Sequence, residues 1–211
     1  MTIACVVLLS LSSNVFAVPM TWTNGHEYDV ILLPVSSSDA ERTWDVARTY
    51  AQSLGSGWDL ATITSADEQA FINSLITSAT TSTKIVEYWI GGYQPSGSVE
   101  PGGNWQWING EGQFWNNGAV SGMYSNWRTG EPNNDSGQGT LGPNYAGGQN
   151  HLALDSRRGW SWDDNDQYLS GYILGYVAEK SNPVPEPSTL LFLGSGIGLA
   201  GIGLLRKRFR K

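Results

Sequence analysis

Cysteine is almost missing from this chain: its 211 residues contain only Cys5. A single cysteine excludes an intrachain disulfide. Because Cys5 lies in a stretch that we expect to be removed, we also expect no thiol chemistry in the mature protein. Histidine is scarce too, with two residues, so the chain lacks the Cys/His partners that a zinc site needs. The fold must therefore be held by its core, without covalent or zinc cross-links.

Basic residues are also few in the body of the chain. Between Trp22 and Lys180 there are 7 Lys and Arg against 18 Asp and Glu, a net charge of −11. Such an acidic body excludes a nucleic-acid partner, which requires a basic face, and suits cations and neutral ligands. Aromatic residues are plentiful, with 10 Trp, 9 Tyr and 5 Phe, and 26 Gly indicate many turns. The length predicts one domain with additional terminal segments.

The N-terminal segment carries an export signature. Residues 1–17 are mostly apolar and free of acidic and basic residues, and Val15 and Ala17 offer small side chains for cleavage after Ala17. Residues 1–17 therefore predict a secretory signal peptide, although the usual basic start is missing. We expect the folded domain to occupy residues 18–181.

The C-terminal segment, residues 182–211, combines Pro185-Glu186-Pro187, an apolar run and a basic end from Arg206 to Lys211. Residues 187–205 contain no charge, which gives 19 positions, just enough to span a bilayer. We place the span at 189–205, with the basic tail on the cytoplasmic side. This segment resembles the PEP-CTERM sorting signal of Gram-negative bacteria. The resemblance implies handling by an exosortase, transient anchoring in the inner membrane, and a final place in the cell envelope or extracellular matrix.

Periodicity predicts one strand and two helices in the first part of the domain. Residues 26–33 alternate as a strand does. Ser38 and Glu41 have the spacing of a capping box, and apolar residues then recur every 3–4 positions, so we expect a helix over 39–54. Ser65 and Glu68 repeat the pattern before a second helix with Phe71 on its apolar face.

Shorter strands are expected after residue 84, at 87–92, 104–110, 149–154 and 171–178. The third of these follows a Gly- and Asn-rich loop between Asn134 and Gln149, whose length suits a surface excursion beside a site. A strand, two helices and several short strands make an α+β domain, in which the helices cover a sheet.

The most informative stretch is Glu131-Pro132-Asn133, four residues after Trp127. If the Glu131–Pro132 bond is cis, which costs about 0.5–1 kcal/mol for X–Pro bonds, the two flanking side chains can point the same way. Convergent oxygens suit Ca²⁺, which takes 6–8 oxygen ligands. The alternative is an ordinary surface turn, because Pro and Asn are common turn residues.

A second polar cluster follows Trp162: Asp163, Asp164, Asn165 and Asp166. Alone it could be a solvated acidic run. Two such clusters about 30 residues apart, each behind a tryptophan, favour one shared cation site.

In this series of motifs the chain resembles the C-type lectin-like domain, in its sugar-binding form, over about residues 24–180. The resemblance implies two helices flanking short antiparallel sheets, with a long loop region that binds Ca²⁺ and sugar. It implies that Glu131, Asn133, Gln149, Asp163 and Asp164 ligate Ca²⁺, and that the first four also contact the sugar. The Glu-Pro-Asn form goes with mannose-type sugars. The motifs that carry the resemblance are Trp89-Ile90-Gly91-Gly92, Trp105-Gln106-Trp107, Asn109-Gly110, Trp127 to Asn133, Trp162-Asp163-Asp164 and Gly175 to Glu179.

Three positions depart from the family pattern. The disulfide cysteines are absent, and His151, which we expect to be a packed residue, stands where one would be. Gln149 replaces a liganding Glu, and Asp163 replaces an Asn, which restores the lost charge. If Asn165 and Asp166 were the liganding pair instead, calcium binding would be weaker, because affinity follows ligand charge.

These observations support an exported, calcium-dependent carbohydrate-binding protein that recognises mannose- or glucose-type sugars of envelope or matrix polysaccharide. Without the metal, we expect the acids to repel one another and the loop to loosen. The alternative is a C-type lectin-like adhesion or structural module that binds no sugar. We expect no enzyme: Glu131 with Asp163 or Asp164 could form a glycosidase pair, but no nucleophile elbow, phosphate loop or zinc-protease motif occurs.

Overall fold

The computed structural model describes residues 18–135, 148–166 and 172–181. The predicted signal peptide (1–17), the sorting segment with its span at 189–205, and most of the Gly- and Asn-rich loop lie outside these residues. None of the helices within the described ranges is long and apolar enough to cross a membrane. In chain order the elements are β1 Met20–Thr21, β2 Glu27–Leu32, η1 Asp39–Arg42, α1 Trp44–Ser53, β3 Trp58–Leu60, α2 Ala66–Ala79, β4 Glu87–Tyr93, β5 Trp105–Trp107, β6 Gln113–Trp115, β7 His151–Asp155, η3 Ser156–Arg158, β8 Ser161–Asn165 and β9 Ile173–Lys180.

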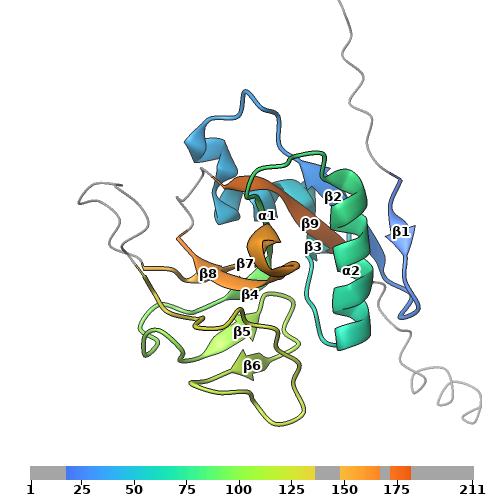
Figure 1. Cartoon of the computed structure of the whole chain (residues 1–211). Helices are drawn as coiled ribbons and strands as arrows, with labels where there is room; N and C mark the ends of the chain where they lie inside the picture. The colour runs from blue at the N-terminus through green and yellow to red at the C-terminus, as the bar shows by residue number, and fades with distance from the viewer. Residues whose placement is uncertain (1–17, 136–147, 167–171, 182–211) are drawn as a thin grey trace, which may run out of the picture. The chain divides into compact units, whose positions relative to one another are not determined.

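A mixed sheet joins the first and last strands of the domain (Figure 1). β2 runs antiparallel to β9, from Glu27 opposite Lys180 to Leu32 opposite Gly175. β9 also pairs with β4, and this pair is parallel, unlike the antiparallel pairing expected from the sequence. β4 continues to β5 and β6 on one path and to β7 and β8 on another, all antiparallel. The architecture is the predicted α+β class.

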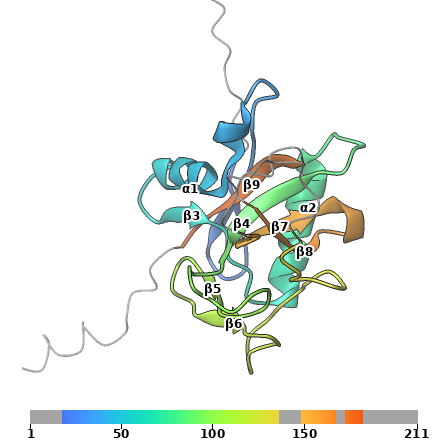
Figure 2. The same cartoon turned by 90° about the vertical axis from the view of Figure 1, so that its left-hand side faces the viewer.

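The two α-helices lie on opposite sides of the β9–β4 region (Figure 2). Each helix places its apolar face in a separate cluster, so the sheet is buried on both sides. The first cluster contains Trp44, Ala47 and Ala51 of α1 with Leu60, Trp89, Tyr176 and Ala178. The second contains Ile72 and Ile76 of α2 with Tyr28, Tyr88, Leu152, Trp162 and Val177.

The first predicted helix is wrong in one respect, because residues 39–54 form two pieces. The Ser38–Glu41 capping box is present, but it caps η1, a 3₁₀ turn that ends at Arg42. Thr43 then adopts an extended backbone, with φ −70° and ψ 155°, and its hydroxyl accepts the N–H of Val46 at 3.3 Å. The helix α1 therefore begins at a second cap, one that the 3–4-residue spacing alone does not reveal.

The second predicted helix is confirmed as α2. The Ser65 hydroxyl accepts the N–H of Glu68 at 3.1 Å, as an N-cap does. The Glu68 carboxylate, however, accepts the Thr64 N–H at 2.7 Å and the Tyr28 hydroxyl instead of completing a capping box. Glu68 is 2% exposed, so its side chain ties α2 to β2 inside the domain.

An aromatic cluster around Trp162 underlies the region of the predicted site. Trp162 is fully buried, and its ring lies 5.5 Å from that of Trp107 and 5.8 Å from that of Trp127, both edge-on. The Trp162 indole N–H donates to the Gln69 side chain of α2 at 2.7 Å. These contacts anchor Trp162, the second residue of β8, in the core; the polar residues that follow it had hidden this strand in the sequence.

Candidate functional site

Two backbone hydrogen bonds bring the two polar clusters together. The Trp162 N–H donates to the carbonyl of Asn126 at 2.8 Å, and the Arg128 N–H donates to the carbonyl of Trp162 at 2.8 Å. The segment before Glu131 therefore lies alongside the start of β8 as an isolated parallel bridge. This pairing places the loop that contains Glu131 directly beside Asp163.

Three carboxylates converge there. Oxygens of Glu131, Asp163 and Asp164 lie within 4.8 Å of one another. The Glu131 side chain is 3% exposed, and Asp164 is 1% exposed. The Glu131–Pro132 peptide bond is cis. Asp164 accepts the N–H groups of Asn133 and Asn134, the latter at 2.7 Å, so the strand residue fixes the backbone of the loop.

The remaining two predicted residues border the same place. Gln149 and Asn133 line a cavity of about 80 Å³ together with Asp163. The Gln149 N–H donates to the Asn134 side-chain oxygen at 2.8 Å, whereas the Asn133 side-chain oxygen accepts the N–H of Asp135 at 2.7 Å. Gln149 is 7% exposed, and its side-chain oxygen has no hydrogen-bond partner among the described residues. Three of the five predicted residues, Asn133, Gln149 and Asp163, thus line one small cavity, and the carboxylates of Glu131 and Asp164 lie next to Asp163.

Two arginines lie among these acids. Arg128 donates to Glu131 and to both oxygens of Asp163 at 3.2 Å. Arg157 donates to Asp163 at 2.7 Å and also binds Asp155 at 2.7 Å. The arginine charges offset part of the carboxylate charge. The expected repulsion between the acids is therefore relieved within the protein itself.

A second acidic group lies behind the first. Glu87 and Asp155 each have a carboxylate oxygen within 4.8 Å of Asp163 and of one another. Arg157 donates to Glu87 at 3.0 Å, and the Asn165 amide donates to the other Glu87 oxygen. Asp163 is shared by both groups, so it connects the exposed loop to the interior of the sheet.

Burial sets the protonation of these acids. Burial raises the pKa of Glu87 to about 8, with the charges of Asp163 and Asp155 adding to the effect. Burial likewise raises the pKa of Asp163 to about 7, reinforced by the Glu131 charge. The pKa of Glu131 rises to about 7, because of burial and then the neighbouring Asp164 carboxyl. All three carboxyls therefore hold protons more tightly than exposed acids do.

The residues fit a hard cation. Glu131, Asp163 and Asp164 supply three carboxylates, and two buried oxygens near them, one of Glu131 and one of Gln149, lack a donor. Buried acceptors without a donor are costly, and a bound cation would satisfy them. Of the alternative pair, Asn165 is turned toward Glu87, whereas Asp164 accepts the N–H groups of Asn133 and Asn134. The positions favour Asp163 and Asp164.

His151 is packed, as expected. Its ring lies 4.6 Å from the Trp44 ring and 6.5 Å from the Trp89 ring. The residue thus fills space in the cluster around α1.

Sequence reasoning did not single out Glu87, Asp155, Arg128 and Arg157. A signal existed for two of them: Glu87 and Asp155 adjoin the apolar stretches Tyr88-Trp89-Ile90 and Leu152-Ala153-Leu154. A charged residue next to a buried strand segment requires a partner. The arginines carried no such signal, because basic residues near a turn are usually solvated.

Comparison with family models matches residues 40–142 to the Lectin C-type domain and residues 183–208 to the PEP-CTERM protein-sorting motif. Comparison with curated proteins finds no match.

Among solved structures, the EPNH mutant of CEL-I, a C-type lectin from Cucumaria echinata, is 20% identical with a TM-score of 0.52, covering 76% of this chain and 92% of that chain. Human lithostathine is 21% identical with a TM-score of 0.52, covering 78% of this chain and 97% of that chain. These likenesses show the fold. The chain thus has the fold of C-type lectins, a match to the Lectin C-type domain over residues 40–142, and a PEP-CTERM sorting motif over residues 183–208.

Proposed function

We propose that this protein is an exported, calcium-dependent lectin that binds mannose- or glucose-type sugars of envelope or matrix polysaccharide. The observation that carries the proposal is the convergence of Glu131, Asp163 and Asp164, with unpaired oxygens of Glu131 and Gln149 beside them. The match to the Lectin C-type domain supports a sugar as the ligand.

Each predicted residue has a distinct chemical role in this proposal. Bound Ca²⁺ would supply the positive charge that draws two neighbouring sugar hydroxyls. Glu131 and Asp163 are acceptors for hydroxyl protons, whereas the amides of Asn133 and Gln149 can donate to hydroxyl oxygens. Asp164, which is 1% exposed, would hold the ion and the loop without touching the sugar. No bond-breaking role is assigned to these acids.

The sorting motif supports the proposed destination of the protein. The match over residues 183–208 supports export and handling by an exosortase. In this proposal the span at 189–205 holds the chain in the inner membrane until processing, and the lectin domain then acts in the envelope or matrix.

Calorimetry with Ca²⁺ and methyl α-mannoside tests the function. The wild-type protein should release heat in Ca²⁺, and EDTA should abolish that heat. Glu131→Gln removes one ligand charge and should weaken Ca²⁺ binding at least tenfold, which is about 1.4 kcal/mol. Glu111→Gln, the same change at an exposed position, is the matched control. Sugar heat that persists in EDTA, or equal Ca²⁺ affinity in both variants, would rule the proposal out.

A second candidate function is an adhesion or structural module that needs neither Ca²⁺ nor sugar. The observation in its favour is that Arg128 and Arg157 already pair with Glu131, Asp163 and Asp155. This alternative predicts the same thermal unfolding midpoint in Ca²⁺ and in EDTA, together with no heat for any glycan. The lectin proposal predicts a higher midpoint in Ca²⁺, because the ion binds only the folded state.

A further inference from the structure

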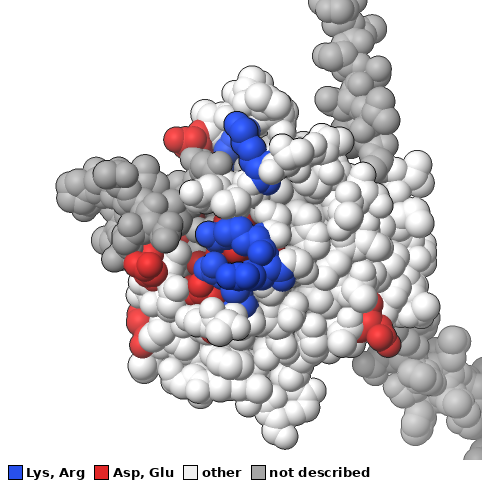
Figure 3. Space-filling model, viewed as in Figure 1, with Lys and Arg blue, Asp and Glu red and all other residues white. Residues whose placement is uncertain are grey.

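Three basic residues of this acidic domain lie close together, since Arg128 lines one cavity with Arg157 and another with Arg158. Only 7 Lys and Arg occur between Trp22 and Lys180, and three of them are Arg128, Arg157 and Arg158. Figure 3 shows the largest blue patch of the visible face at the centre of the view, over η3 and the start of β8. A domain with a net charge of −11 has no general need for such a patch, so it calls for a specific explanation.

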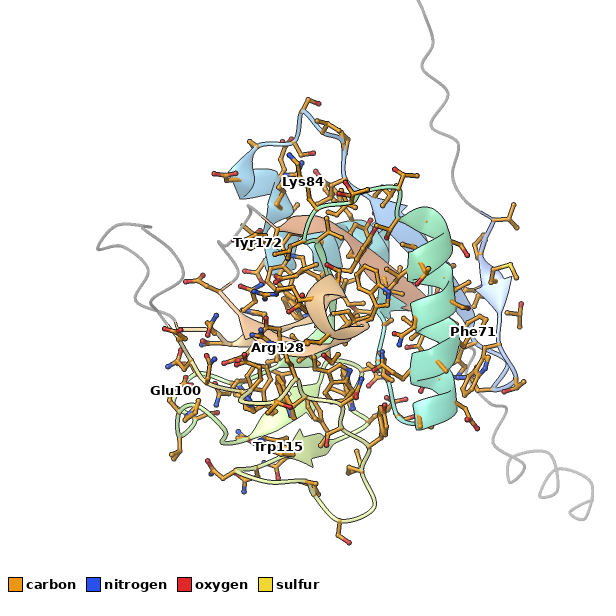
Figure 4. The ribbon with its side chains drawn as sticks, in the orientation of Figure 1. Phe71, Lys84, Glu100, Trp115, Arg128 and Tyr172 are labelled. Carbon is orange, nitrogen blue, oxygen red and sulfur yellow. The ribbon has the colours of Figure 1, made fainter. Side chains whose placement is uncertain are left out.

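A groove of about 490 Å³ lies in this region, lined by Trp127, Arg128, Thr129, Arg158 and Ser161. This volume falls within the roughly 300–1,000 Å³ typical of small-molecule sites. Arg128 also lines the small cavity beside Gln149 and Asp163, so the groove shares a wall with the candidate cation site. The two spaces are therefore adjacent, so neighbouring units of one oligosaccharide could occupy both. In Figure 4, Arg128 marks this shared wall, and Tyr172 marks the far side of the small cavity.

The arginines of the patch differ in what they bind. Arg128 and Arg157 are turned inward to carboxylates. Arg158 is exposed, and within the described ranges no carboxylate forms an ion pair with it and no side-chain hydrogen bond is made by it. Its guanidinium is thus available to a ligand, at the edge of a groove that no acidic residue lines.

Two more lining residues carry unused polar groups. The Ser161 hydroxyl and the Trp127 indole N–H are buried and lack a hydrogen-bond partner among the described residues. A hydroxyl can rotate to donate, and an indole N–H can only donate. The Arg158 guanidinium can donate two parallel hydrogen bonds to a pair of anionic oxygens, and the Ser161 hydroxyl and the Trp127 indole N–H could add neutral donors beside it.

We propose that this groove binds the anionic group of an acidic saccharide unit, with Arg158 as its charged anchor. The inference rests on the proposed function for the identity of the ligand as a glycan. It adds that the preferred glycan is acidic, either through the carboxylate of a hexuronic acid or through a sulfate ester. The shared chemistry is a flat or tetrahedral oxyanion on a sugar ring.

The test compares matched oligosaccharides by calorimetry in Ca²⁺: a mannose trisaccharide, the same backbone with one glucuronate, its carboxyl-reduced neutral form, and a sulfated form. The wild-type protein should bind at least one acidic form about tenfold more tightly than the neutral forms. A stronger effect of the glucuronate or of the sulfate identifies the source. The preference should weaken with salt, because the anchor is exposed.

Arg158→Gln should abolish this preference while leaving neutral-sugar affinity unchanged. Lys84→Gln, which removes the same charge from another exposed residue apart from the groove (Figure 4), is the control and should keep the preference. Ser161→Ala should reduce the preference for acidic forms by a smaller factor than Arg158→Gln does. Equal affinity for acidic and neutral forms, or equal losses in both arginine and lysine variants, would overturn the inference.

Failure of the two proposals can be told apart. In one outcome, neutral sugar gives no calcium-dependent heat, but the glucuronate form binds in EDTA and loses affinity in Arg158→Gln. This outcome would support the groove proposal and contradict the calcium-lectin proposal. If neutral sugar binds with Ca²⁺ and acidic groups do not raise the affinity, the result would support the lectin proposal and contradict the groove proposal. If no saccharide binds in any condition, both are wrong.

Discussion

At the scale of the single residue, His151 shows how the fold replaces a cross-link with packing. It begins β7, and its ring lies between Trp44 of α1 and Trp89 of β4. One ring nitrogen is buried without a hydrogen-bond partner among the described residues. Burial lowers the pKa of His151 to about 4, since the charged form has lost its water. The native state therefore requires the neutral imidazole.

This requirement predicts an acid-sensitive stability. In the unfolded chain histidine binds a proton below about pH 6.5, whereas folded His151 does so only below about 4. Between these values His151 holds more protons in the unfolded state than in the folded state, so its own contribution to the free energy of unfolding falls as pH is lowered from 6.5 to 4, by up to about 3 kcal/mol.

Urea unfolding at pH 7 and pH 4 checks the prediction in the wild-type protein and in His151→Phe, which keeps an aromatic ring but cannot titrate. The loss of stability on acidification should be smaller in the variant by about 2–3 kcal/mol. An equal loss in both proteins would show that other groups cause the acid sensitivity.

Residue roles were readable from the sequence where chemistry and spacing agree. The acids after Trp162 and the Glu131-Pro132-Asn133 stretch stood out because acids and amides cluster behind aromatics, and the structure brings them within 4.8 Å. The pairing of Arg128 with Asp163 and of Arg157 with Glu87 could not be foreseen, because these partners are 35 and 70 residues apart in the sequence. Only the β4–β7–β8 pairing places Glu87, Asp155 and Asp163 on one side.

At the scale of secondary-structure elements, α2 supports the strand that carries the candidate ligands. Gln69 accepts the Trp162 N–H at 2.7 Å, and its own amide donates to the carbonyl of Trp160 at 3.3 Å. One side chain of α2 thereby holds both the indole and the backbone at the start of β8. Asp163 and Asp164 follow immediately on that strand.

Gln69→Ala should therefore affect both stability and the site. It leaves the buried Trp162 N–H without an acceptor, which costs about 1–3 kcal/mol. It should also weaken Ca²⁺ binding severalfold, because β8 loses its anchor. Ser65→Ala removes the N-cap of the same helix at a cost of about 1 kcal/mol and should leave Ca²⁺ affinity unchanged. Chemical unfolding and calcium titration of both variants would reveal the contrast. Equal calcium affinities would contradict it.

Longer helices and strands with a clear apolar period were predictable from the sequence, whereas short ones were not. The helix α2 and the strands β2, β4, β7 and β9 were expected near their observed places. The strands β3 and β6 have three residues each, too few to show a period. β8 reads as an acidic run, since its polar side chains are satisfied by arginines and loop N–H groups that the local sequence does not contain.

At the scale of the whole molecule, the folded domain and the sorting segment are expected to be independent. The last strand ends at Lys180, and the compact unit that contains the site ends at Ser181. The sorting motif is matched only from residue 183 onward. The site residues all precede this boundary.

A chain of residues 18–181 should thus retain the calcium and sugar affinities of a chain of residues 18–211. Both affinities should agree within about twofold, which is about 0.4 kcal/mol. Calorimetry on the two purified chains in the same mild detergent makes the comparison. A large loss on truncation would show that the terminal segment takes part in binding.

The fold class and family were recognisable from an ordered series of motifs, none of which is specific alone. The pairing of strands in the sheet was not recognisable, because the parallel pairing of β4 with β9 depends on packing between segments about 85 residues apart. Short-range patterns report which face of a segment is buried, but they do not report which strand lies beside it.

The course of β9 has a consequence for how the domain presents its ligand. The strand starts at Ile173, next to Tyr172 at the small cavity, and ends at Lys180 beside Glu27. At about 3.3 Å per residue, its length is roughly 23 Å. Lys180, where the strand ends, is thus remote from the small cavity. A label attached at Lys180 would therefore sit at the end of β9 opposite to that cavity.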